Sequence, residues 1–315
     1  MNQLHSLHPE FAIELKKIMG KIIETPKNAL LSITEFETTE RNIRAYDLVF
    51  HDNSKFSFSE FRYSYVTISA NFLKFNSPQL KSTVTLGNFP IDHLTGETGV
   101  NGIDATSDDN GGDGRTGGKG QSQPVPDIYL FINEMETDID VIPKIDWTVM
   151  AQGVQGGRGG KGGQGGKGGK GKNGSQARVR VDGCHGGGDG KRGGDGGRGG
   201  RGGDGGDGSD GGDIFIIANS DVIKKMSYFK YINNGGSPGE GGYPGNSGEP
   251  GEGGDGGKSS GGCGGGDHGK PGNVLQSLGF GLTGAKGKRG NIYYIDINDL
   301  GNEEKSMFIE MMATK

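Results

Sequence analysis

The chain is poor in the residues that normally build a protein interior. Of its 315 residues, 30% are hydrophobic, 8% are aromatic and only two are cysteines. Two cysteines are too few for a disulfide scaffold. No segment reaches the ~18 consecutive apolar residues that a membrane span needs, so we expect no membrane span. The first 25 residues contain no uncharged apolar run of the kind found in cleaved secretory signals, which predicts cytoplasmic synthesis without a signal peptide.

The chain also lacks the charge and the motifs of several functional classes. Its formal net charge is −5, which argues against binding nucleic acid through bulk positive charge. Its acids and histidines follow no catalytic spacing, and no nucleophile is paired in the sequence with a base. The sequence therefore predicts a protein that is not an enzyme and that needs no cofactor.

Glycine is the residue that the chain has in abundance, and its glycines are phased. There are 67 of them, whereas average usage is about 7% of residues. In three long runs glycine recurs at every third residue, and shorter runs repeat the pattern. A period of three matches the left-handed polyproline-II helix, which has three residues per turn. The long runs span 153–174, 187–211 and 236–257, and the shorter ones span 96–102, 111–120 and 281–290.

Glycine at two of every three positions favours a bundle of such helices within one chain. The first two long runs are mostly GGx, so two faces of each helix would be bare backbone. Bare faces permit close approach and lateral hydrogen bonding between helices, which is the packing called polyglycine II. Collagen, by contrast, needs only one glycine per triplet. A three-chain collagen is the alternative suggested by the prolines of the third run, and disorder is the alternative suggested by composition.

The rest of the sequence predicts a mainly β body with an N-terminal helix. Hydrophobic spacing predicts a helix from about 8 to 25, which either covers a core or docks a partner. Runs of β-branched and aromatic residues predict strands, which would also suit a parallel β-helix with glycine-rich loops. The expected domains are a helix plus β-rich body in 1–152 with an excursion at 96–120, a polyglycine-II bundle with interspersed strands in 153–290, and a closing strand and tail in 291–315.

Charged residues at the x positions of the triplets form one candidate site. The x positions of 153–174 include no acid, those of 239–258 are mainly acidic, and those of 187–213 are mixed. These charges are either solvated, paired between adjacent helices, or arranged as a basic ridge that binds a ligand. Arginines between glycines also suggest an RNA-binding RGG box. The ridge would consist of Arg158, Lys161, Lys167, Lys170, Arg198 and Arg201.

Both cysteines lie near a histidine within glycine-rich sequence. Cys184 directly precedes His185, and Cys263 lies five residues before His268. Two cysteines and two histidines are the ligand types of a tetrahedral zinc site, although this spacing is no known finger pattern. A disulfide between the cysteines, or two free thiols, are the other interpretations. A metal or a disulfide would tie two glycine-rich excursions together.

The triplets of residues 153–290, with weaker pieces at 96–120, resemble those of known polyglycine-II proteins. One group is the receptor-binding tip adhesins of T-even-like phage tail fibres, in which glycine-rich motifs stack into a sandwich. The glycine-rich antifreeze protein of snow fleas is similar in repeat type only. The resemblance to the adhesins implies tip residues that contact a receptor, and the exposed candidates are Tyr243, Leu278 and Phe280.

These observations together predict a binding or structural protein. We expect an adhesin-like protein whose rigid glycine-rich bundle presents a surface to a protein or glycan receptor or to a larger protein assembly. The chain would be a monomeric bundle or a subunit of a complex, and the resemblance implies incorporation into a virion or a released assembly. The alternatives are an intracellular scaffold or sensor subunit docked through the N-terminal helix, and an RGG-type RNA binder.

Overall fold

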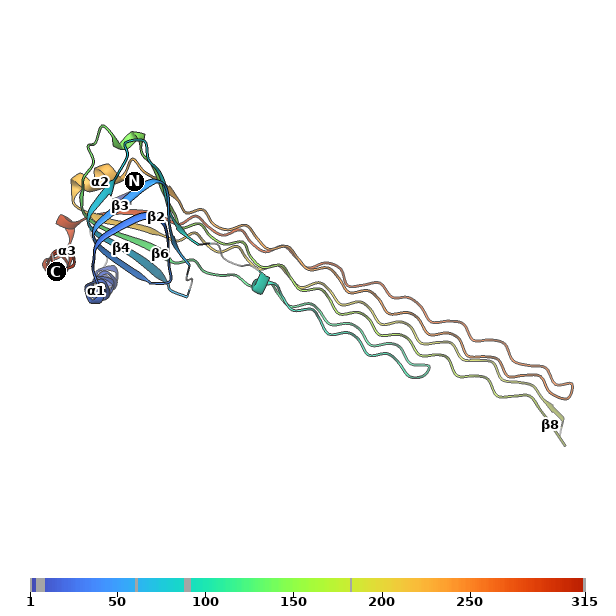
Figure 1. The fold of residues 1–315 in the computed structure, drawn as a ribbon. Coiled ribbons are helices and arrows are strands. Elements are labelled where there is room, and N and C mark those ends of the chain that lie inside the picture. The colour runs from blue at the N-terminus through green and yellow to red at the C-terminus, as the bar shows by residue number, and fades with distance from the viewer. Residues whose placement is uncertain (1, 4–8, 60–61, 88–91, 182, 314–315) are drawn as a thin grey trace.

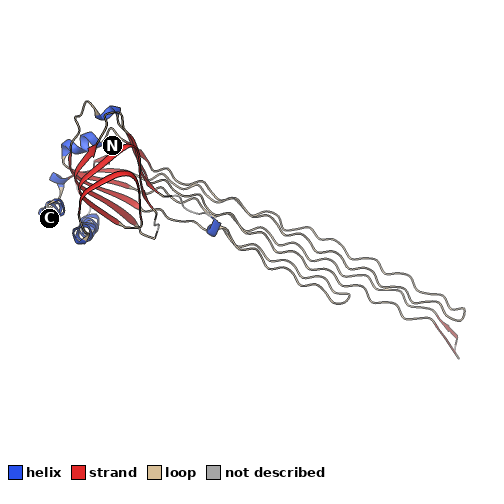
Figure 2. Cartoon of the chain, in the orientation of Figure 1, coloured by secondary structure: helices blue, strands red, loops and turns tan. Residues whose placement is uncertain are grey.

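A computed structural model describes residues 2–3, 9–59, 62–87, 92–181 and 183–313 of the chain. It consists of a strand-rich body from which a long, narrow rod of glycine-rich chain projects (Figure 1). Apart from one 3-10 turn at its base (Asp92–Leu94), the described part of the rod contains no helix, and its only strands are two short ones at its far end (Figure 2). The chain is therefore one β-rich body with three long excursions.

The elements of secondary structure alternate between strands and short helices. The helices are α1 (Pro9–Glu24), α2 (Ser220–Met226) and α3 (Asn302–Met312), with 3-10 turns η1 (Asp92–Leu94), η2 (Ile142–Lys144) and η3 (Ile297–Asp299). The strands are β1 (Asn2–Gln3), β2 (Asn28–Thr38), β3 (Asn42–Phe58), β4 (Tyr65–Phe75), β5 (Lys81–Leu86), β6 (Asp127–Met135), β7 (Asp146–Met150), β8 (Arg178–Arg180), β9 (Gly183–His185), β10 (Ile214–Ala218), β11 (Lys230–Ile232) and β12 (Ile292–Asp296). The sequence ARVRVD at 177–182 is one of the runs that predict a strand, and its last residue, Asp182, lies outside the described residues. His8, at the start of the expected helix, also lies outside them.

The body is one parallel sheet that curves into a nearly closed, barrel-like form. It has ten strands in the order β1-β12-β10-β6-β4-β3-β5-β7-β11, and β2 also pairs with β3. Every pairing in this sheet is parallel, including that of β2 with its immediate successor β3. Consecutive parallel strands require the chain to return to the same end of the sheet each time. The glycine-rich excursions lie in three of these returns, between β5 and β6, β7 and β10, and β11 and β12.

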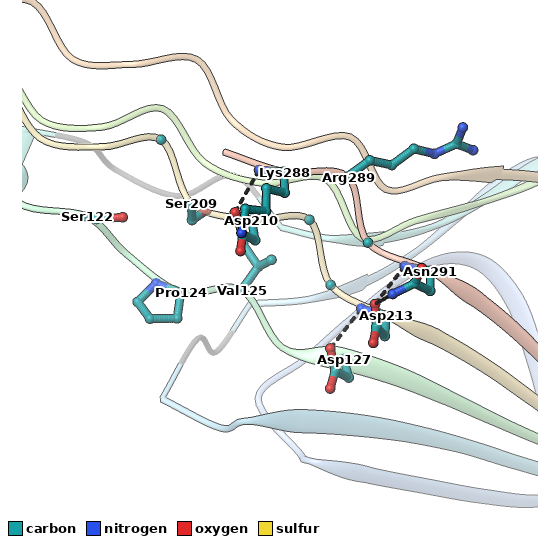
Figure 3. A pocket seen from close by; sticks show the side chains of 14 residues that line it. Ser122, Pro124, Val125, Asp127, Ser209, Asp210, Asp213, Lys288, Arg289 and Asn291 are labelled. Atoms are coloured by element: carbon teal, nitrogen blue, oxygen red, sulfur yellow. Dashed lines mark hydrogen bonds between the residues drawn. The ribbon is translucent and has the colours of Figure 1, made fainter. Parts of the chain in front are cut away.

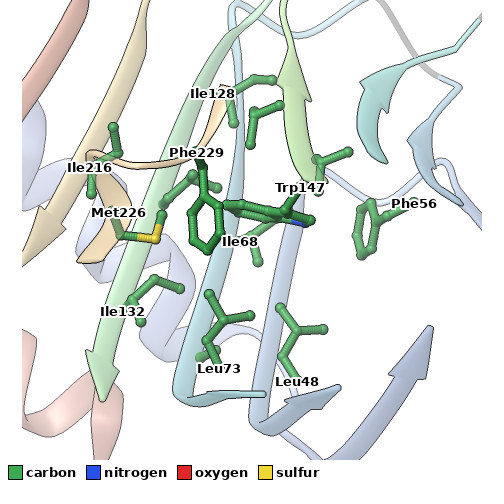
Figure 4. Close-up of a cluster of buried hydrophobic side chains, with 14 of the residues drawn as sticks. Leu48, Phe56, Ile68, Leu73, Ile128, Ile132, Trp147, Ile216, Met226 and Phe229 are labelled. Atoms are coloured by element: carbon green, nitrogen blue, oxygen red, sulfur yellow. The ribbon is translucent and has the colours of Figure 1, made fainter. Parts of the chain in front are cut away.

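The inner face of this sheet encloses the main hydrophobic core. Aligned positions on neighbouring strands form stacks, such as Ile68 beside Leu130 and Leu130 beside Ile216. On the other arm of the sheet Phe56 is aligned with Val84. All five side chains are buried in one cluster, part of which Figure 4 shows. This core fixes the register of the strands, because a shift by one residue would turn every apolar side chain outward.

The outer face carries a second, smaller core that α1 and α3 cover. The ring of Phe215 stacks on Tyr129 at 4.4 Å and on Tyr293 at 4.8 Å, and Phe11 of α1 stacks on Phe215 at 5.3 Å. The predicted N-terminal helix is thus confirmed, and it covers a core. Its buried residues follow helical spacing, which explains the amphipathic pattern. They are Leu15, Ile18, Met19 and Ile22.

The expected C-terminal tail is instead the helix α3, which packs against α1. Phe308, Met311 and Met312 are buried at helical spacing, in the same cluster as α1. Their spacing in the sequence was a signal for an amphipathic helix. In the described part of the chain, no helix is long and apolar enough to cross a membrane.

The rod consists of three extended hairpins, each with an outgoing and a returning arm. We call them the short hairpin (96–120), the central hairpin (153–211) and the outer hairpin (236–290). Their arms run side by side away from the body, and the short hairpin ends before the other two (Figure 1). Among the described residues, hydrogen bonds join the central hairpin to both others, but none joins the short hairpin to the outer one. The central hairpin therefore lies between its two neighbours.

The arms are joined by backbone hydrogen bonds at intervals of three residues. The outgoing arm of the central hairpin donates from Gly156 to Ser237 at 3.0 Å and from Gly159 to Glu240 at 2.8 Å. The residue after each of these donors bonds in another direction, as Gly157 does to Gln121 at 2.8 Å. Most triplets of a central arm thus present two bare faces to neighbours and one side chain to solvent. The bonds run within a single chain, and a three-chain rope is not needed to make them.

Candidate functional site

The far tip of the rod is the first candidate site, because it is exposed and cross-linked. Strands β8 and β9 form a small antiparallel pair in which Cys184 is opposite Val179. A disulfide joins Cys184 to Cys263, with their Cα atoms 5.5 Å apart, and so ties the central hairpin to the outer one. Val179 is 61% exposed and Val181 is fully exposed. The tip therefore presents apolar side chains next to exposed Arg178 and Arg180, beside a covalent cross-link between two hairpins.

The two histidines near the cysteines do not join them in a metal site. His268 lies with its Nδ1 atom 3.5 Å from Oδ1 of Asp255, on the arm beside it. His185 is the last residue of β9 and is exposed. In the described ranges no group of three or more His, Cys, Asp or Glu residues is placed to hold a metal ion. Both sulfur atoms are already used by the disulfide, which leaves no thiolate as a zinc ligand.

The basic ridge lies along the central hairpin, and much of its charge is paired within the rod. The outgoing central arm is next to the acidic outgoing arm of the outer hairpin. Three ion pairs bridge them, and their side chains remain largely exposed, so each contributes little. The pairs are Arg158–Glu240 at 3.9 Å, Lys167–Glu249 at 3.2 Å and Lys170–Asp255 at 3.6 Å. Arg201 pairs with Asp204 on its own arm at 2.7 Å.

Lys161 and Arg198 are the remaining members of the predicted ridge. Both are exposed, Lys161 on the outgoing central arm and Arg198 on the returning one. The backbone N–H of Arg198 donates to the carboxylate of Asp113, so this residue also holds the short hairpin in place. The six residues therefore do not form a single uncompensated basic surface.

A row of aspartates on the returning central arm is a feature that the sequence interpretation missed. Their carboxylates accept hydrogen bonds of 2.6–2.8 Å from backbone N–H groups of the outer hairpin and of Asn291, the residue that follows it. These bonds lower the pKa of Asp195 and of Asp204, with the backbone N–H of Asn273 and of Leu282 as the main causes. The signal in the sequence was the spacing of aspartates by multiples of three. The aspartate row is Asp189, Asp195, Asp204, Asp207 and Asp210 on the arm, with Asp213 just beyond its end.

The predicted tip contacts lie on the side of the rod, well short of its tip. The carbonyl of Tyr243 accepts from Gly162, nine residues beyond Gly153 at the base of the central arm. Tyr243 and Phe280 contact each other edge to face, with ring centroids 5.6 Å apart, and the guanidinium of Arg158 lies 4.5 Å from the Tyr243 centroid. Val274, Leu278 and Leu282 are further exposed apolar residues on the same arm as Phe280, and we call these five residues the side cluster.

The side cluster coincides with an interruption of the glycine repeat. The triplet phase of the outer hairpin would place glycine at 275 and 278, where leucines stand. The N–H of Leu278 donates to the carbonyl of Gly199 at 3.0 Å, on the central hairpin, and the hydroxyl of Ser277 donates to Gly245 at 2.7 Å. Gly279 adopts a φ of 96°, a conformation that glycine permits. The regular pattern resumes at Gly281.

An open cavity at the junction of rod and body is the remaining candidate site. It has a volume of about 630 Å³ and is lined mainly by the returning central arm and the end of the outer hairpin (Figure 3). The carboxylate of Asp127 accepts from the backbone of Asp213 at 2.8 Å, and that of Asp213 accepts from the backbone of Asn291 at 2.6 Å. Burial raises the pKa of Asp127 to about 6. These acids align the first residues of β6, β10 and β12, which is an anchoring role.

Comparisons with known proteins add little to this geometry. No family model matches the chain, and no curated protein matches it. Among solved structures, one match is the antifreeze protein of the springtail Granisotoma rainieri, which is described as a nine polyproline type II helical bundle. The two sequences are 21% identical over a match that covers 55% of this chain and 98% of the springtail chain, and the TM-score is 0.09. A TM-score this low carries no argument about fold or function.

Proposed function

We propose that this chain is a non-enzymatic, adhesin-like binding protein in which a β-helix-like body carries a polyglycine-II bundle. The hydrogen bonds between arms at every third residue support the polyglycine-II description, since that helix has three residues per turn. The coiling of successive parallel strands supports the β-helix description. In this proposal the body is the attachment end and the rod is the presenting end.

The single observation that carries the proposal is the exposed and cross-linked tip. A central arm of 153–174 would span about 70 Å at roughly 3.1 Å per residue, far more than packing against the body requires. At its end the disulfide between Cys184 and Cys263 restrains the turn that carries exposed Val179 and Val181. A preorganised turn loses less entropy when it binds a partner. The partner in this proposal is a protein or glycan receptor.

The two alternative functions receive less support from the geometry. Most of the apolar face of α1, through which a partner could dock, is already buried against the body, and Ile13 of this helix is 51% exposed. Binding of RNA by an RGG box would require arginines that are not compensated, whereas Arg201 is paired with Asp204. The disulfide also favours an oxidising location, which suits incorporation into a virion or a released assembly.

The test is binding of the labelled full-length protein to a panel of intact bacterial and animal cells and to a glycan array. A Val179→Asp/Val181→Asp variant changes the tip, and Ile309→Asp is the matched control, because Ile309 is exposed to 68% on the body. We expect binding that the tip variant loses and the control keeps. Equal binding by both variants would assign the contact to another surface. Absence of binding to every cell and glycan would refute the receptor proposal.

A further inference from the structure

The side cluster lies on one edge of the rod, and the opposite edge carries an apolar patch of its own. Val100 and Ile103 of the short hairpin are 66% and 83% exposed. On the outer hairpin, Val274 is 67% exposed and Leu278 is 50% exposed. An otherwise charged rod thus exposes apolar side chains on its two outermost hairpins. Exposed apolar patches of this kind mark interaction sites.

The two patches lie at the same distance from the body. One row of backbone hydrogen bonds joins Val100 to Arg115, Arg115 to Gly163 and Gly163 to Gly200, across the rod. The residue before Gly200, Gly199, accepts the hydrogen bond of Leu278, so Val100 and Leu278 lie at the same level. A second row of backbone hydrogen bonds joins Ile103 to Gly112, Gly112 to Gly166 and Gly166 to Gly197. The residue before Gly197, Gly196, donates to Asn273, so Ile103 lies at the level of Asn273 and Val274. Two parallel rods placed side by side would therefore bring Val100 opposite Leu278 and Ile103 opposite Val274.

The charges of the two edges are opposite. The short hairpin, 96–120, has five acidic and two basic residues, a net charge of −3. The returning arm of the outer hairpin, 266–290, has four basic residues and one acidic residue, a net charge of +3 with histidines neutral. The same contrast remains when the charges that pair with the central hairpin are left out on both edges. Without Glu240, Glu249 and Asp255, the whole outer hairpin has five basic and two acidic residues, a net charge of +3. Without Asp108 and Lys119, the short hairpin has four acidic residues and one basic residue, a net charge of −3.

Two residues of opposite charge, Lys270 and Asp109, lie at the same level of the rod on opposite edges. The carbonyl of Lys270 accepts from Gly193, and the carbonyl of Asp109 accepts from Gly169, which in turn bonds Gly194. Lys270 and Asp109 are thus level with each other on opposite edges. Side-by-side rods that match their apolar patches also bring this lysine opposite this aspartate.

We propose that the rods of two copies of this chain associate side by side, with the outer hairpin of one copy against the short hairpin of the next. The contact is heterologous, because the two surfaces are different, and each copy keeps one free edge. Repetition of the contact gives a row of parallel rods with all tips at one end. This inference goes beyond the proposed receptor binding and needs no receptor.

The experiment measures mass against concentration by sedimentation of the full-length chain, up to roughly 100 µM, where contacts of modest affinity are populated. We expect the wild type to form dimers and longer species. Val100→Asp/Ile103→Asp removes one edge, and Val274→Asp/Leu278→Asp removes the other, so each variant alone should be monomeric. Their equimolar mixture should form dimers and nothing larger, since only one intact pair of edges remains.

A milder variant guards against effects on folding. Lys270→Glu changes one exposed side chain, and we expect it to weaken association roughly tenfold, as truncation of an important interface contact does. Ile309→Asp, on the body, should associate like the wild type. A wild type that stays monomeric at every concentration would overturn the proposal, and so would a mixture that stays monomeric or edge variants that each still dimerise. Loss of receptor binding has no bearing on any of these outcomes.

Discussion

The close approach of the arms predicts that a single methyl group in the middle of the rod is destabilising. Gly163 is buried, and a Cβ atom built on it would overlap the carbonyl oxygen of Val100 on the short hairpin. That oxygen belongs to backbone and cannot move aside as a flexible side chain would. Gly163→Ala therefore forces the short hairpin away from the central hairpin over at least one triplet.

The size of the effect follows from the hydrogen bonds at that level. Separation breaks the bonds from Gly163 to Arg115 at 2.8 Å, from Gly99 to Lys161 at 2.7 Å and from Gly102 to Gln164 at 2.7 Å. Each contributes about 1 kcal/mol net, so their loss costs about 3 kcal/mol. Alanine offsets about 0.4–1 kcal/mol of this by restricting the unfolded chain. We expect a net destabilisation of about 2 kcal/mol, confined to the contact between these two hairpins.

Amide hydrogen exchange of the full-length protein measures this local free energy. Protection should fall in 96–120 and in the facing part of the central arm, and should stay unchanged in the body. Gln164→Ala is the matched control, because Gln164 is next to Gly163 in the chain and is exposed. Equal protection in the two variants, or wild-type protection in Gly163→Ala, would refute the reasoning that glycine is required by contact between arms.

Three further predictions concern the disulfide and the acids. Cys184→Ser should increase amide exchange at the tip and leave the base of the rod unchanged, because the disulfide closes only the far end. The pKa of Asp204 is lowered in the folded state, so the hydrogen bonds to its carboxylate stabilise the fold at neutral pH. Amides of the returning arms should therefore lose protection as the pH falls below about 4, and Asp204→Ala should remove part of that dependence. The pKa of Asp127 is raised to about 6, so the folded protein holds this proton more tightly than the unfolded chain does. Its contribution to stability therefore decreases as the pH rises from about 4 to 6, and urea unfolding of Asp127→Asn should lack this slope.

The glycine pattern contains more about the arrangement of the arms than its period alone. The central arms have GGx triplets because both neighbouring hairpins contact them, whereas the outer hairpin has Gxx triplets at its free edge. Lys172 and Lys191 replace the second glycine of the triplet just beyond the end of the short hairpin. Asp108, in the turn of that hairpin, pairs with them at 2.9 and 3.8 Å. The number of glycines per triplet therefore reports how many sides of an arm are covered, and could have been read from the sequence.

The prolines of the third run have a similar explanation. Pro238, Pro244 and Pro250 stand at the third position of triplets on the outer hairpin, which no further hairpin of the chain covers. Proline has no N–H group, so at an edge it leaves no backbone donor unpaired. It does not hinder contacts made through side chains. These residues suggested collagen in the sequence, yet they are accounted for by the edge of a rod made from one chain.

The pairing partners of the arms could not be predicted, because a triplet repeat does not specify its own register. A slip of one arm by three residues restores every lateral backbone bond in the middle of the rod, so the repeat distinguishes poorly between registers. The body supplies the missing information, since β6, β10 and β12, the strands that follow the three hairpins, are aligned with one another in the sheet. At the junction, Asp127 and Asp213 extend that alignment into the first triplets. The contrast between a strongly patterned core and a weakly specified rod explains why the sequence predicted triplet tracts that pack laterally, but not which hairpin lies in the centre.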